Sequence, residues 1–156
     1  MKNKIISSEN AKFEVSLKFF IKNKKKEILL LEMPENSSMA GFYDFPGGRI
    51  RESEKDLQFS KIIRRELLEE LGKKILCKIK DIPVAISRHT YISKITKQKQ
   101  YILWIFFEAE FNGGEIALSD EHKNYVWVDL NKKNYKKYFV RGPLEGAAHY
   151  LIKKMA

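Results

Sequence analysis

Apolar and polar residues alternate along the first part of the chain, a pattern typical of a β-strand with one buried face. From Lys12 to Ile21, apolar residues occupy every second position, and the positions between them are polar as far as Lys18. A polar turn at residues 23–26 leads to a second, more apolar strand at residues 27–31. These segments predict a β-hairpin whose first strand is half-buried, with Ser16 and Lys18 on its polar face.

A helical pattern extends from Glu54 to Leu71, between two turns that contain glycine. Ser53 and Asp56 have the spacing of a capping box at its start, and Gly72 stands where a helix commonly ends. At about 100° per residue, four leucines share one face, and three glutamates lie roughly opposite them. We expect the first half of this helix to pack on both sides, and the glutamates to face a cleft from the second half. The leucines are Leu57, Leu67, Leu68 and Leu71, and the second apolar side carries Phe59, Ile62 and Ile63.

The rest of the chain predicts further strands and two more helices, without an internal repeat. Two principal helices with a mixed β-sheet indicate an α/β/α sandwich. We expect a single domain over residues 1–156. The expected strands are 75–79, 84–92, 101–111, a short one at 115–118, and 125–128; the expected helices are 131–138 and 143–155.

Composition places the chain among soluble globular proteins, with 44% hydrophobic and 32% charged residues. No apolar run approaches the roughly 18 residues of a membrane span. Residues 1–7 carry charge without an apolar core, so we expect no signal peptide. Cys77 is the only cysteine, which excludes an internal disulfide and a cysteine-based metal site. A cytoplasmic location without a membrane partner is the expectation.

The formal net charge of +10 raises the question of a nucleic-acid partner. Lysines are spread along the chain, whereas four of the six arginines fall between positions 49 and 65. Arginine suits bidentate contacts with phosphate. This bias favours a small anionic substrate over general duplex binding, although an RNA-associated protein is the alternative that charge and aromatic content suggest.

Three glutamates, Glu66, Glu69 and Glu70, stand at i, i+3 and i+4 and therefore share one helix face. Carboxylates this close repel one another at neutral pH unless a cation lies among them. Oxygen ligands of this kind suit Mg²⁺ or Mn²⁺ better than zinc. The alternative is an ordinary solvated helix face with surface ion pairs.

The context of these glutamates resembles the Nudix hydrolase family, whose box reads G-x5-E-x7-R-E-U-x-E-E-x-G-U, with U aliphatic. Gly48 and Glu54 match its first half at the family spacing. The second half is matched by Arg65, Glu66, Leu67, Glu69, Glu70 and Gly72. Ten residues rather than seven separate Glu54 from Arg65, and Lys73 holds the closing aliphatic position. The three extra residues either lengthen the helix or form a loop before it.

The resemblance implies a Nudix-type α/β/α fold and hydrolysis of a nucleoside diphosphate linked to another group, with Mg²⁺ or Mn²⁺ as cofactor. It implies metal ligands at the Gly47 carbonyl and at Glu66, Glu69 and Glu70. Arg65 would orient the glutamates, and Glu54 would support the junction of loop and helix. Candidates for the base that activates water are Glu69, Glu70 and Glu121.

For substrate contacts the sequence offers Arg49, Tyr43 and Arg88. Arg49 follows the glycine pair directly, Tyr43 is one of the aromatics before it, and Arg88 could reach a phosphate from a strand. We expect His122 to cap or pack and Trp127 to belong to the core. The substrate is left open between a nucleoside diphosphate sugar and a nucleoside triphosphate. A non-catalytic nucleotide- or RNA-binding protein of the same fold is the alternative, and a homodimer is compatible with the sequence.

Overall fold

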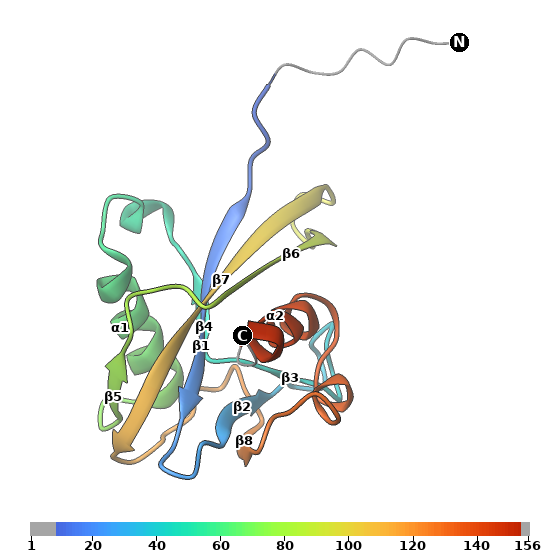
Figure 1. The fold of residues 1–156 in the computed structure, drawn as a ribbon. Helices are drawn as coiled ribbons and strands as arrows, with labels where there is room; N and C mark the ends of the chain where they lie inside the picture. The colour runs from blue at the N-terminus through green and yellow to red at the C-terminus, as the bar shows by residue number, and fades with distance from the viewer. Residues whose placement is uncertain (1–8, 154–156) are drawn as a thin grey trace.

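Two parallel strands form the centre of the molecule in the computed structural model, which describes residues 9–153. Strand β1 (Glu14–Lys22) pairs with β7 (Lys99–Gly113) over its whole length, from Glu14 beside Ile102 to Lys22 beside Glu110. The remaining strands join this pair in antiparallel orientation and complete one mixed sheet of eight strands (Figure 1).

The other strands are short and flank the central pair on both sides. Strands β2 (Ile28–Glu32) and β4 (Gly47–Arg49) pair with β1, whereas β5 (Leu76–Ile79) and β6 (Ala85–Ile92) pair with β7. Strands β3 (Tyr43–Asp44) and β8 (Asn124–Val128) both pair with β2. Strands β3 and β4 fall where the sequence suggested only a loop and a turn.

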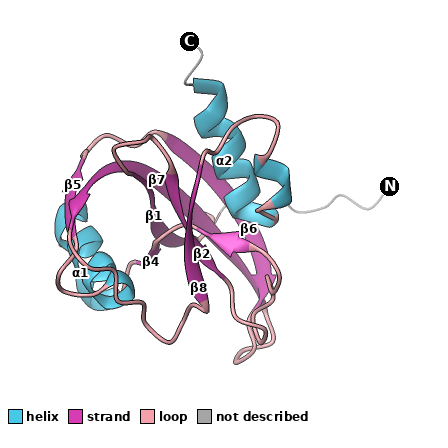
Figure 2. Ribbon diagram, turned by 90° about the horizontal axis from the view of Figure 1, so that it is seen from below, coloured by secondary structure: helices cyan, strands magenta, loops and turns pink. Residues whose placement is uncertain are grey.

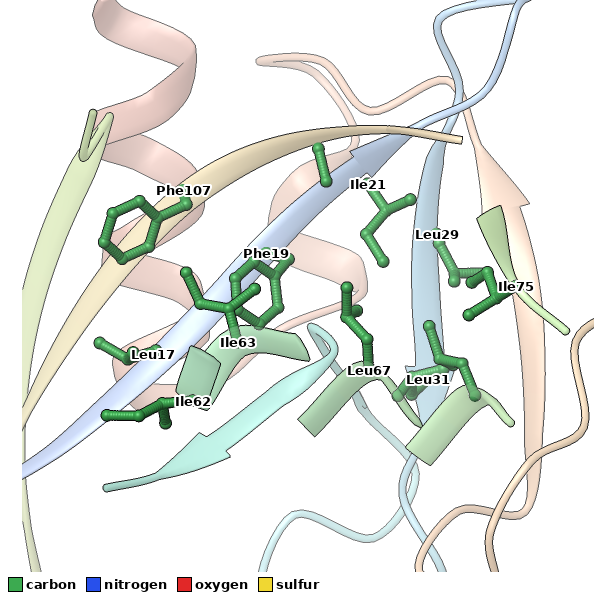
Figure 3. Packing of buried hydrophobic residues seen from close by; sticks show 12 residues of the cluster. Leu17, Phe19, Ile21, Leu29, Leu31, Ile62, Ile63, Leu67, Ile75 and Phe107 are labelled. Atoms are coloured by element: carbon green, nitrogen blue, oxygen red, sulfur yellow. The ribbon is translucent and has the colours of Figure 1, made fainter. Parts of the chain in front are cut away.

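One helix covers each face of the sheet, which confirms the mixed α/β sandwich (Figure 2). Helix α1 (Phe59–Leu71) packs Ile62, Ile63 and Leu67 onto aliphatic and aromatic side chains of β1, β2 and β7 (Figure 3). Helix α2 (Arg141–Lys153) covers the opposite face, where the ring of Tyr150 stacks on Phe20 with centroids 3.9 Å apart.

Strand β1 is buried on both faces, so the expected half-buried strand is wrong. Ser16 and Lys18 are only 2% and 7% exposed. The reason is tertiary, because β1 is an interior strand with neighbours on both edges and packed residues on both faces. An alternating sequence pattern does not reveal that the second face is covered as well, because that cover comes from residues distant in the chain.

Helix α1 begins at Phe59 rather than near Glu54, because the extra residues form a loop instead of lengthening the helix. A single turn of 3₁₀ helix, η1 (Glu52–Glu54), precedes that loop. The carboxylate of Glu54 accepts a hydrogen bond from the Arg51 N–H at 2.9 Å. The expected capping box at Ser53 therefore does not form, whereas Gly72 ends the helix as expected, with φ of +88°.

The buried face of α1 also differs from the expected one. Leu57 lies in the loop and is 44% exposed, and Leu68 is 42% exposed. The buried residues are Ile62, Ile63, Glu66, Leu67, Glu70 and Leu71. Two of the three glutamates therefore lie beside the apolar face and not opposite it, which brings their carboxylates to the sheet.

Smaller corrections concern the C-terminal half. Residues 115–118 form no strand, and 131–138 form turns with a short 3₁₀ helix, η2 (Tyr135–Lys137). Helix α2 starts two residues earlier than expected, and its expected end at Met155, like the N-terminal segment 1–7, lies outside the described residues. Within residues 9–153, no helix has the length and apolar character needed to cross a membrane.

Gly146 gives a direct test of how α2 packs on the sheet. A Cβ at this position would lie 2.2 Å from Cζ of the fully buried Phe106. Overpacking of this kind costs about 1–3 kcal/mol, whereas glycine-to-alanine replacement in a helix returns at most about 1 kcal/mol. We expect Gly146→Ala to lower the free energy of unfolding, measured by urea denaturation.

The control is Ile152→Ala, at a position of α2 that is 62% exposed. Its effect should stay within about 0.5 kcal/mol, as for most surface substitutions. A Gly146→Ala protein as stable as the wild type would show that α2 does not pack in this way.

Candidate active site

A cavity of about 590 Å³ opens between β1, β4 and the C-terminal half of α1. Half of the residues in its wall are charged, with groups of both signs, and apolar side chains form the other main part of it. Of the residues singled out in the sequence, the wall contains Gly47, Arg49, Arg65, Glu66, Glu69, Glu70 and Glu121. Further residues of the wall are Ser16, Lys18, Met33, Met39, Asp44, Gly48, Arg51, Ile102, Trp104, Ser119 and His122.

The Gly47-Gly48 pair lets the backbone of β4 lie close to both β1 and α1. Gly47 has φ of +119°, and a Cβ there would lie 2.0 Å from the Leu17 carbonyl oxygen. A Cβ on Gly48 would lie 2.5 Å from both carboxylate oxygens of Glu66. Only glycine fits at Gly47, whereas a side chain at Gly48 would have to displace the Glu66 carboxylate.

Glu66 and Glu70 are buried beside this turn, with 6% and 4% of their surfaces exposed. The Gly47 N–H donates to Glu70 Oε2 at 2.6 Å, and the Arg65 Nη1 donor lies 2.7 Å from Glu66 Oε1. Burial raises the pKa of Glu66 above its ordinary value, and burial likewise raises the pKa of Glu70 to about 8. Both carboxylates therefore lack sufficient positive charge from the protein itself.

Arginines hold the other carboxylates of this region. Nε and Nη2 of Arg65 bind the two carboxylate oxygens of Glu54, with Nη2 to Oε2 at 2.8 Å, despite the longer connection between the two residues. Arg65 also donates to Glu69 at 2.9 Å, and Arg51 holds both oxygens of Glu69 at 3.0 and 2.8 Å. The hydrogen bond from Arg65 lowers the pKa of Glu54. For Glu69, hydrogen bonds from both arginines outweigh desolvation and lower its pKa.

The loop before β8 supplies the far wall of the cavity. Glu121 is exposed there, and His122 Nε2 lies 4.0 Å from Glu70 Oε1. Burial lowers the pKa of His122, so the ring is neutral at pH 7 and packs rather than carrying charge. Among the described residues, three buried side-chain atoms have no hydrogen-bond partner: Trp104 Nε1, Ser119 Oγ and His122 Nδ1. All three belong to residues of this wall, so a bound molecule or water can satisfy them.

Lys18, Asp44 and Arg51 are charged residues of the wall that were not predicted as site residues from the sequence, and Lys18 and Asp44 pair with each other. Their ion pair is 2.8 Å long, and both side chains are 8% exposed. Burial works to lower the pKa of Lys18, but Asp44, Glu70 and Glu66 outweigh it and raise the pKa. No sequence signal could have placed this lysine, since its alternating context assigned it to the solvent side.

Two of the expected substrate contacts lie away from the cavity. Tyr43 packs its ring edge-on against Tyr138, with centroids 5.7 Å apart. Arg88 lies in β6 and lines a separate hollow beside Phe13. Arg49 does reach the cavity, where its guanidinium lies over the Tyr91 ring at 4.9 Å and remains half exposed.

The donor set can be tested against a divalent cation. Within the described part of the chain, no three His, Cys, Asp or Glu side chains converge on one metal position. Glu69 is held by Arg51 and Arg65 instead. The buried pair Glu66 and Glu70 does suit such an ion, because both side chains line the cavity and their oxygens are of the kind that Mg²⁺ prefers.

Comparison with known proteins agrees with this geometry. The family model described as NUDIX domain matches residues 12–143. The nucleoside triphosphatase NudI of Escherichia fergusonii is 27% identical over 128 residues, which are 74% of this chain and 88% of that protein. A crystal structure of a MutT protein from Methanosarcina mazei superposes with a TM-score of 0.64 at 25% identity, over 95% of this chain and 97% of that one.

A second solved structure, the dihydroneopterin triphosphate pyrophosphohydrolase of E. coli, shares the fold. Its TM-score is also 0.64, at 14% identity, and the match covers 90% of this chain and 98% of that chain. The family match spans most of the described residues and includes the glycine turn, the helix α1 and the cavity between them. The chain belongs to the NUDIX domain family and is a Nudix hydrolase.

Proposed function

We propose that this protein hydrolyses a pyrophosphate bond in a nucleoside diphosphate linked to another group, with Mg²⁺ or Mn²⁺ as cofactor. The observation that carries the proposal is the buried pair Glu66 and Glu70 beside the Gly47-Gly48 turn. Nudix hydrolases generally use divalent metal ions, and this pair offers the oxygen ligands for one. Glu69 would join the set only if its carboxylate exchanged its hydrogen bonds with Arg51 and Arg65 for the ion.

A bound divalent ion would neutralise phosphate charge and lower the pKa of a coordinated water. The protein supplies the positioning that phosphoryl chemistry mainly requires. Arg65 keeps Glu66 and Glu69 in place through hydrogen bonds, and Glu54 in turn fixes Arg65. Glu69, Glu70 and Glu121 all line the cavity and are the candidates to accept the proton of the attacking water.

The cavity also suits a substrate with an anionic and a less polar part. Arg49 at the rim pairs with Glu14 through Nε at 3.1 Å, and more than half of its side chain is exposed, so its remaining N–H groups are offered to phosphate. Met33, Met39 and Ile102 form an apolar section of the wall for the remaining group. The name of the relative NudI supports nucleoside triphosphates as one class, and nucleoside diphosphate sugars are the other. A cytoplasmic location and a homodimer both stay predictions.

A substrate panel tests the proposal. Nucleoside triphosphates and nucleoside diphosphate sugars would be incubated with Mg²⁺ and with Mn²⁺, and release of phosphate and pyrophosphate would be measured. We expect hydrolysis of at least one class that requires the ion. Nucleotide binding or salt-sensitive RNA binding without any hydrolysis would instead support the non-catalytic alternative.

Glu70→Gln should reduce turnover by orders of magnitude. The substitution keeps an oxygen that can accept the Gly47 N–H but removes the charge that a cation requires. At about pH 5, where the buried carboxyl of the folded wild type is protonated, thermal unfolding of the variant should remain close to that of the wild type. The matched control is Glu52→Gln, whose exposed carboxylate pairs with Lys55, and its turnover should be unchanged. Near-normal turnover of Glu70→Gln would show that Glu70 is not a metal ligand.

The stability of the metal-free protein should depend on Glu70 in a defined pH window. In the folded state its pKa is about 8, against an ordinary value of 4.5. Between these values the folded state binds more protons than the unfolded state, so the free energy of unfolding falls as pH rises. Between about pH 5 and pH 8, we expect the midpoint temperature of thermal unfolding to fall more steeply for the wild type than for Glu70→Gln. Parallel curves for the two proteins would contradict the raised pKa.

A further inference from the structure

Lys18 reaches the cavity from β1 and uses all its hydrogen-bond donors there. Its Nζ donates to Asp44 Oδ2 at 2.8 Å, to the Phe45 carbonyl oxygen at 3.1 Å and to the Gly47 carbonyl oxygen at 2.8 Å. An ammonium group has three N–H bonds, so this set of acceptors is complete. The side chain is 8% exposed, which means that water contributes little to its solvation.

The register of the sheet fixes this arrangement. Lys18 stands directly opposite Gly47 in the antiparallel pairing of β1 and β4. Both backbone polar groups of Gly47 are bound: its N–H donates to Glu70 of α1, and its carbonyl oxygen accepts a hydrogen bond from Lys18 of β1. The lysine therefore belongs to the same structural unit as the candidate metal ligand Glu70.

The family resemblance implied that the Gly47 carbonyl binds a metal ion. In this chain the Lys18 ammonium already donates a hydrogen bond to that carbonyl oxygen, at a distance typical of a charge-assisted hydrogen bond. The field of Lys18 also acts on Glu70 and Glu66, as one of the charges that oppose the effect of burial on both carboxyls. The positive charge next to the glutamates is thus partly supplied by the protein.

We propose that Lys18 is a positioning residue that acts as a built-in cation: its ammonium takes the place of a metal ion at the Gly47 carbonyl and limits the number of divalent ions that the substrate-free protein binds. The inference rests on the proposed metal-dependent function. It assigns divalent ions to the glutamates of α1 and excludes them from the oxygens around Lys18 Nζ.

The consequence of removing the lysine follows from its three partners. A carboxylate and two carbonyl oxygens would be left facing one point without a cation, and one of them would carry a buried negative charge. Such an oxygen-only set is the kind that Mg²⁺ and Mn²⁺ bind. Loss of Lys18 should therefore create a binding position for one additional divalent ion.

Lysine labelling tests the proposal on the wild-type protein. Acetic anhydride would be applied with and without saturating Mn²⁺, and the acetylated lysines would be mapped by mass spectrometry. We expect Lys18 to stay protected in both conditions, while Lys78, an exposed lysine of β5, is labelled rapidly. Labelling of Lys18 at the rate of Lys78 once Mn²⁺ is present would overturn the proposal, because the ion would then have displaced the ammonium.

Metal counting provides the second measurement. Mn²⁺ binding to the substrate-free protein would be followed by electron paramagnetic resonance for the wild type, Lys18→Ala and Lys78→Ala. The expected result is one additional Mn²⁺ per chain for Lys18→Ala and no change for Lys78→Ala, which removes the same charge from an exposed strand position. An unchanged number and affinity in Lys18→Ala would overturn the proposal. If Lys18→Ala does not fold, the labelling result decides alone.

These outcomes are separate from those of the proposed function. Neither labelling nor metal counting requires turnover, so an enzyme that hydrolyses no member of the substrate panel can still show a protected Lys18. Conversely, a Lys18 displaced by Mn²⁺ in an active hydrolase would refute the built-in cation and leave pyrophosphate hydrolysis intact.

Discussion

The close approach of the Gly47-Gly48 turn to the backbone of β1 and to the glutamate side chains of α1 is the constraint on which the site depends. The turn has to fit between β1 and the carboxylates of α1, where any side chain on it would collide with the Leu17 carbonyl or with Glu66. That proximity allows Glu70 to accept the N–H of Gly47 while Lys18 donates to the carbonyl oxygen of the same residue. The position of the buried carboxylates, the shape of the cavity and the placement of its charges all follow from it.

Charge is distributed unevenly across this site. Glu54 and Glu69 are held by arginine and have lowered pKa values, whereas Glu66 and Glu70 are buried and have raised ones. Carboxylates of one sequence motif therefore divide into a group that maintains geometry and a group that needs a cation. Exposure alone does not make the difference, since Glu54 is 7% exposed and Glu66 is 6% exposed. Hydrogen bonding to Arg65 lowers the pKa of Glu54, whereas desolvation dominates at Glu66 and Glu70.

Much of the fold could be derived from periodicity and turn chemistry. The strands at residues 84–92 and 101–111, the end of α1 at Gly72 and the two-helix sandwich agree with the structure to within a few residues. The sequence-based predictions were wrong where a local capping or helix pattern competed with contacts between residues distant in the chain. Ser53 does not cap the helix, because Glu54 accepts a hydrogen bond from the Arg51 N–H in a separate 3₁₀ turn. The extra residues form a loop after this turn, and Glu54 binds Arg65 across it.

The sequence by itself determined the family resemblance, the candidate glutamates and their helix, because these depend on fixed spacing within one segment. Only the tertiary structure decided which glutamates are buried, that Tyr43 and Arg88 lie outside the cavity, and that Lys18 and Trp104 lie in its wall. The physical reason is that burial of a strand residue depends on which segments cover both faces of its sheet. Lys18 is the clearest case: alternation placed it in solvent, and the pairing of β1 with β4 placed its ammonium on the Gly47 carbonyl.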